Sequence, residues 1–122
     1  MDQRVKKMWI KALESGKYKQ TRGNLASRLD DEKRPTERSG FCCLGVLCDL
    51  YEKEKKVESI DFSNFVPPKE VLLWAGIDDL STSEVKLPGL KDKYGNDAHL
   101  VLLNDGRKYN FSKIAQVIRE KL

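Results

Sequence analysis

Three cysteines stand in one apolar stretch of the chain, and thiols are among the most nucleophilic side chains that a protein can use. A thiol near a helix N-terminus has a lowered pKa, and a neighbouring imidazole can take its proton. Cys42 or Cys43 would be the nucleophile, His99 the base, and Asn104 or Asp105 the group that orients the imidazole. This combination predicts a cysteine-dependent hydrolase or transferase. The same residue types occur together in most chains of this size, so the sequence leaves the question of an enzyme open and leans towards a non-catalytic protein.

The cysteine spacing does not suit a metal ion. Zinc sites use Cys-x-x-Cys pairs or a cysteine and a histidine at similar reach, whereas these thiols lie at positions 42, 43 and 48 with one histidine at 99. The sequence also lacks a glycine-rich phosphate loop and a paired-carboxylate signature. We therefore expect no metal, no cofactor and no nucleotide hydrolase of the common classes. At least two of the cysteines are expected to be buried as small hydrophobic residues.

A second group of candidate residues lies in the polar segment after the first predicted helix. Tyr18, Gln20, Arg22, Asn24 and Arg28 provide a stacking ring, amides and guanidinium groups, which together suit a base and phosphates. The alternative is that Tyr18 packs in the core, Gln20 satisfies backbone groups beside the central helix, and the arginines are solvated. These five residues form the predicted ligand-binding site.

Positive charge is concentrated in the same part of the chain. Residues 1–38 carry eleven Lys or Arg against six Asp or Glu, whereas the remainder carries twelve against thirteen. Such a bias can attract phosphate groups, nucleic acid or an acidic protein surface. Nucleic-acid binding needs basic residues interleaved with aromatic ones on one face, and residues 17–22 hold only a fragment of that pattern. Nucleic acid is therefore the less favoured partner.

The apolar run at residues 40–51 is the one stretch that could lie at the centre of a domain and position these groups. A helix that is apolar on all sides is normally buried on all sides, so we expect a central buried helix at about residues 41–51. Gly45 within it lowers the helix propensity by about 1 kcal/mol relative to alanine. A close helix crossing, or a ligand approaching the backbone, would explain this glycine.

Apolar stripes with helical spacing predict helices at residues 3–14, at residues 68–75 and from residue 111 onwards. Minor strands are expected at residues 17–25 and at 57–66 or 85–88. A chain of 122 residues fits one domain with a core of its own. The predicted fold is a small single α+β domain over residues 1–122, mainly helical, with a central buried helix and minor short strands.

Signals for export and membrane insertion are lacking in the sequence. The N-terminal stretch has no apolar region of the signal-peptide type, and no apolar run approaches the roughly 20 residues that span a bilayer. An odd number of cysteines, two of them adjacent, favours free thiols in a reducing compartment. We expect a soluble cytoplasmic protein with no membrane partner.

Three stretches together resemble a known family. The first is built on Trp9, Ala12, Leu13, Ser15, Gly16, Tyr18, Gln20, Gly23 and Leu25; the second is Gly40-x-Cys42-Cys43-Leu44-Gly45-Val46-Leu47-Cys48-Asp49-Leu50; the third joins Leu103-Asn104-Asp105 to Phe111-x-x-Ile114-Ala115-x-x-Ile118. The chain resembles a family of small, mostly uncharacterised proteins encoded by bacteriophages and prophages. This resemblance implies a context, the cytoplasm of a bacterial host, rather than an activity.

The favoured function is therefore a phage-type, non-catalytic binding protein that modulates a host process, for example as an antagonist of host defence. It would act by binding an anionic nucleotide-like ligand or by docking on a host protein. The alternatives are the cysteine-dependent enzyme and a small nucleic-acid-binding protein. The sequence does not decide whether the protein forms a homo-oligomer.

Overall fold

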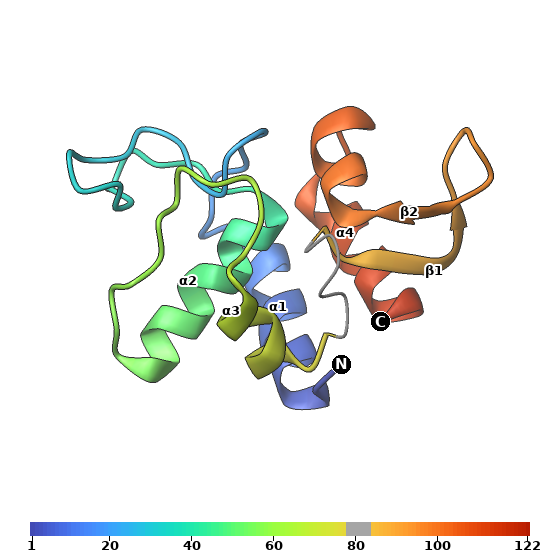
Figure 1. Ribbon diagram of the computed structural model, residues 1–122, viewed down its shortest axis with the longest axis horizontal. Helices are drawn as coiled ribbons and strands as arrows, with labels where there is room; N and C mark the ends of the chain where they lie inside the picture. Colours follow the sequence, from blue (N-terminus) through green and yellow to red (C-terminus); the bar gives the residue numbers. More distant parts are fainter. Residues whose placement is uncertain (78–83) are drawn as a thin grey trace.

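A computed structural model describes residues 1–77 and 84–122 of the chain. In chain order, these residues form the helices and strands α1 Gln3–Glu14, α2 Cys43–Lys55, α3 Lys69–Ala75, β1 Lys86–Lys91, β2 Asp97–His99, the π-helix η1 Leu102–Gly106 and α4 Phe111–Lys121 (Figure 1). The two strands pair as one antiparallel hairpin. The predicted fold class, a small α+β domain that is mainly helical, is confirmed.

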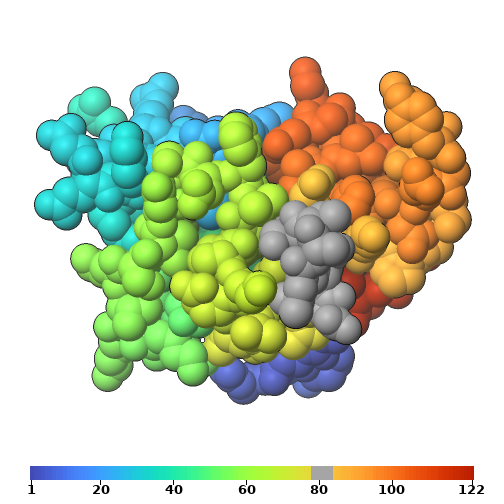
Figure 2. Space-filling view, viewed as in Figure 1, coloured from blue at the N-terminus to red at the C-terminus, as the bar shows by residue number. Residues whose placement is uncertain are grey.

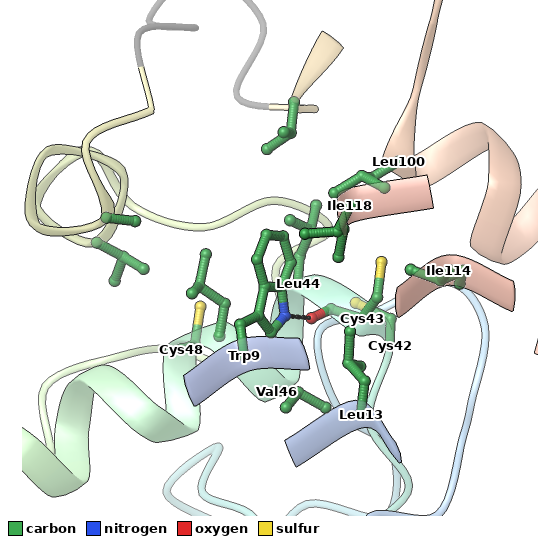
Figure 3. Close-up of a cluster of buried hydrophobic side chains, with 14 of the residues drawn as sticks. Trp9, Leu13, Cys42, Cys43, Leu44, Val46, Cys48, Leu100, Ile114 and Ile118 are labelled. Carbon is green, nitrogen blue, oxygen red and sulfur yellow. Dashed lines mark hydrogen bonds between the residues drawn. The ribbon is translucent and has the colours of Figure 1, made fainter. Parts of the chain in front are cut away.

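Helix α2 is the central helix that the sequence predicts. It begins two residues later than expected, and it extends to Lys55 because the charged residues after the apolar run continue the helix into solvent. Its first six residues, 43–48, are all buried. Apolar side chains from α1 and α4 surround it, and the Trp9 indole nitrogen donates to the carbonyl of Cys43 at 2.9 Å (Figure 3). A tryptophan that is both buried and hydrogen-bonded fixes one orientation between two helices.

The flanking helices follow their apolar stripes. The first predicted helix, residues 3–14, is α1, and its N-cap Asp2 accepts a hydrogen bond from the amide of Val5 at 2.9 Å. Helix α4 begins at the predicted residue, with the Asn110 side chain accepting from the amide of Lys113 at 2.9 Å. Helix α3 begins one residue later than predicted, after Pro68. None of the described helices is long and apolar enough to cross a membrane.

The strand predictions are only partly confirmed. Residues 85–88 overlap β1, which pairs Lys86 with His99 and Leu87 with Ala98. Residues 17–25 and 57–66 form no strand; Gln20 makes only an isolated bridge, to Phe41. Instead of a sheet, loops satisfy the backbone there, since the amides of residues 25 and 26 donate to the carbonyls of residues 64 and 62 at 2.8 and 3.1 Å. Alternating side chains make a strand only where a second strand is available to pair.

Gly45 marks the closest backbone approach to the central helix. A Cβ built at this position would lie 1.8 Å from the carbonyl oxygen of Leu25, which also accepts from the Cys42 amide at 3.0 Å. The close approach predicted from the sequence is therefore a crossing by an irregular segment rather than by another helix. Because the obstacle is backbone, a rotamer change cannot relieve the clash.

We predict that Gly45→Ala destabilises the protein by about 2 kcal/mol or more, although alanine has the higher helix propensity. Denaturant unfolding monitored by far-UV circular dichroism measures this change. Ser112→Ala is the control, because Ser112 is exposed in α4 and its replacement should change the free energy of unfolding by less than about 0.5 kcal/mol. A Gly45→Ala protein as stable as the wild type would contradict the close contact.

Candidate functional site

A hollow of about 980 Å³ lies between the C-terminal half of α1, the segment at residues 28–39 and the exposed face of α2. We call it the basic pocket. Its lining comprises Met8, Lys11, Ala12 and Ser15, residues 17–19, Arg28, residues 35–39, Phe41, and Asp49, Leu50 and Lys53. The segment that forms its outer wall projects from the body of the molecule at the left of Figure 2. Residues far apart in the sequence therefore meet around one hollow.

Positive charge dominates the pocket lining. Among the described residues, six cations line the pocket and face two carboxylates, Glu37 and Asp49. Lys53 forms an ion pair with Asp49 at 2.9 Å. The other five cations make no side-chain hydrogen bond or ion pair in the described part of the chain; they are Lys11, Lys17, Lys19, Arg28 and Arg38. All five are exposed, so their charge is available to an anion that enters.

An aromatic pair forms the inner surface of the pocket. The rings of Tyr18 and Phe41 meet edge to face with centroids 5.2 Å apart. The Tyr18 hydroxyl donates to Asp49 Oδ2 at 2.5 Å, and the ammonium of Lys53 lies 5.4 Å from the tyrosine ring centroid. Burial, and then the hydrogen bond to Asp49, raise the pKa of Tyr18 to about 12. The phenol is protonated at neutral pH, and its hydrogen bond to Asp49 holds the ring in position.

A partly buried ion pair holds the outer wall of the pocket in place. Arg34 donates from both terminal nitrogens to Glu52, at 2.6 and 2.8 Å, and Glu52 also accepts from the amide of Ile60 at 3.0 Å. Glu52 is only 5% exposed, and the hydrogen bond to it raises the pKa of Arg34. The hydroxyl of Thr36 closes the segment by donating to the carbonyl of Arg28 at 3.0 Å. Arg28 and Arg38 thus project from a wall with little freedom to move.

The structure divides the five predicted ligand-binding residues. Tyr18 and Arg28 line the basic pocket. Gln20 instead donates to Asn104 Oδ1 at 2.9 Å and to the carbonyl of Tyr109 at 2.8 Å, which matches the structural alternative in which it satisfies groups beside the central helix. Arg22 donates to the carbonyl of Asn104 at 3.0 Å. Asn24 is half-buried and lies outside the pocket lining.

Four cations of the pocket are not among the ligand-binding residues that the sequence predicts. Lys11, Lys17, Lys19 and Arg38 line the pocket, and each belongs to the first 38 residues, where the positive charge is concentrated. The excess of positive charge in residues 1–38 therefore indicates the part of the chain that forms the pocket. It could not identify individual residues, because only the fold brings residues 11–19 and 28–38 to the same hollow.

The three thiols are buried inside the domain. Cys42 is 4% exposed, and its sulfur accepts from the amide of Gly45 at 3.3 Å as the cap of α2. Burial raises the pKa of Cys42 to about 11 and raises those of Cys43 and Cys48 well above the usual value. The expectation of a lowered thiol pKa at the helix N-terminus is therefore wrong, because burial outweighs the hydrogen bonds from the helix amides.

Of the proposed partners of the thiols, Asn104 lies beside Cys43 but bonds to its backbone amide. His99 lies in β2, and the described residues provide no hydrogen bond to its buried Nδ1. Asn104 is also buried: its Oδ1 accepts from the amide of Cys43 at 3.2 Å, and its Nδ2 donates to Asp105 and to the carbonyl of Thr21. The Asn104 side chain thus ties backbone segments together. In the described part of the chain, no three His, Cys, Asp or Glu side chains are grouped to hold a metal ion.

We predict that none of the three thiols reacts rapidly with a disulfide reagent in the folded protein at pH 8, and that all three react in denaturant. Alkylation of Cys42 should continue to rise towards pH 11, instead of levelling near the usual cysteine pKa of about 8.5. Mass spectrometry of the alkylated protein across pH measures both effects. A single thiol that labels rapidly at neutral pH would contradict this burial and favour the enzyme hypothesis.

Comparison with known proteins places the chain in a family without assigning a chemistry. No curated protein is similar enough to match the chain. No solved structure matches it either. A family does match, along residues 1–122. The chain therefore belongs to the family described as a domain of unknown function (DUF8296).

Proposed function

We propose that the protein is a non-catalytic binding protein that holds an anionic, nucleotide-like ligand in the basic pocket. The observation that carries this proposal is the set of five exposed cations, unpaired within the described chain, around a pocket with an aromatic inner surface. Its volume of about 980 Å³ lies at the upper end of the range of roughly 300–1,000 Å³ that is usual for ligand pockets. Positive charge can bind the phosphates of a nucleotide, and an aromatic ring can stack on its base.

Each part of the pocket has a role that fits its chemistry. The guanidinium groups of Arg28 and Arg38 can each bind a phosphate through two parallel hydrogen bonds. Lys17 and Lys19 add mobile positive charge near the same place. The Tyr18 ring, fixed by Asp49, offers an aromatic surface for a base. These groups together would bind the ligand. The proposed role does not require a nucleophile.

The biological role that we propose rests on the resemblance to bacteriophage and prophage proteins. A non-catalytic protein in a bacterial cytoplasm can modulate a host process by lowering the free concentration of a ligand that the host uses. Antagonism of a defence pathway that signals through such a ligand is one role of this kind. The burial of all three thiols supports this binding role over the cysteine-dependent enzyme.

We predict that the protein binds nucleotides and that Arg38→Glu weakens this binding by at least about tenfold. One charged hydrogen bond contributes about 1.5–3 kcal/mol, and charge reversal adds repulsion. Isothermal titration calorimetry with the common 5′-nucleotides at low and physiological salt measures the affinity. Lys93→Glu is the matched control, because Lys93 is exposed in the turn between β1 and β2 and outside the pocket lining.

The control should bind as the wild type does. Native mass spectrometry of the protein mixed with a small-molecule extract of bacteria covers ligands that are missing from the nucleotide set. If no nucleotide binds and no phosphate-containing adduct is found, the proposed function is wrong. Equal losses in the Arg38→Glu and Lys93→Glu proteins would mean that binding depends on net charge and not on the pocket.

A further inference from the structure

A second hollow, of about 690 Å³, adjoins the basic pocket along α1. Lys11, Ser15 and Lys17 line both hollows. The second hollow continues along the helix past Lys7 and reaches Arg119 in the last turn of α4. The two hollows are therefore neighbouring parts of one surface, with a shared border on α1.

The second hollow is also basic and has an apolar floor. Its acidic residue, Glu14, accepts from Arg119 at 2.9 Å, and the Lys6 ammonium donates to the carbonyl of Arg119 at 3.2 Å. Lys7 is exposed and has no side-chain partner among the described residues. The largely buried Ile10 contributes apolar surface. The second hollow therefore resembles the basic pocket, because exposed lysines surround an apolar surface in both.

Three polar residues of the second hollow are spaced along one face of α1 and its C-cap. Lys7, Lys11 and Ser15 follow one another at intervals of four residues, which places them in a row on the helix surface. At 1.5 Å per residue, the row is about 12 Å long. Lys7 and Lys11 are the charged members of this row, and Lys17 carries the positive charge on into the basic pocket. The two hollows together therefore offer positive charge to anionic groups that lie apart on one ligand.

We infer that the ligand is of dinucleotide size, with one nucleotide in the basic pocket and its second phosphate over Lys7 in the adjoining hollow. This inference rests on the proposed function and specifies its ligand class. That second phosphate is the one that joins the two nucleotides, and Lys11 and Lys17, which belong to both hollows, would contact it together with Lys7. Lys7 is then a specificity-determining residue, because it contacts only the ligand with two separated phosphates.

The test compares 5′-phosphorylated homodinucleotides of the four bases with the matching mononucleotides, by calorimetry with the whole chain. We expect the best dinucleotide to bind about tenfold more tightly than its mononucleotide, as one added charged contact would give. Lys7→Gln should remove this difference while leaving mononucleotide affinity unchanged. Lys93→Gln, at an exposed lysine outside both hollows, should change neither affinity.

Three outcomes overturn this inference. If the mononucleotide binds as tightly as the dinucleotide and Lys7→Gln alters neither, the second hollow is not part of the site, whereas the proposed function stands. If an oligonucleotide of about twelve residues binds far more tightly than the dinucleotide, with a steep loss of affinity in salt, the surface belongs to a nucleic-acid-binding protein. Failure of every nucleotide to bind would overturn the proposed function and this inference together.

Discussion

One buried amide side chain joins three segments of this fold that are distant in sequence. Asn104, in the π-helix η1, is only 1% exposed. Its oxygen accepts from the Gln20 side chain and the Cys43 amide, and its nitrogen donates to the Thr21 carbonyl and the Asp105 carboxylate. All its hydrogen-bonding groups are used, as a buried polar side chain requires. The start of the central helix, the irregular segment beside it and the C-terminal part of the chain are positioned by this side chain.

Local pattern was sufficient to predict helices α1 to α4, but not the π-helix η1 or the loops. The stripes of α1 and α4, and the apolar run of α2, each follow from residues close in sequence. The segment that crosses Gly45 shows an alternating pattern, yet it pairs with loops because the described residues place no strand beside it. The roles of Asn104 and of the carbonyl of Leu25 depend on contacts between distant segments. The spacing of apolar residues along the sequence does not predict such contacts.

The same limit applies to the candidate site. Tyr18 and Arg28 were predicted as ligand-binding residues and line the basic pocket, whereas Gln20 and Arg22 are directed to the C-terminal part of the chain. Alternation would place Tyr18, Gln20 and Arg22 on one side of a strand, but the segment is not a regular strand and its side chains separate. The types of side chain in residues 18–28 were enough to indicate that this segment could bind a ligand. Only tertiary structure could divide it into groups that face the pocket and groups that maintain the fold.

The ion pair of Arg34 and Glu52 would also affect the rate of the ligand binding that we propose. It orders the outer wall of the basic pocket as part of folding, so the conformational entropy of that wall is lost before any ligand arrives. A ligand would therefore meet an open, formed site rather than wait for a loop to close. Association would be set by electrostatically guided encounter, and differences in affinity between related ligands would appear in their residence times.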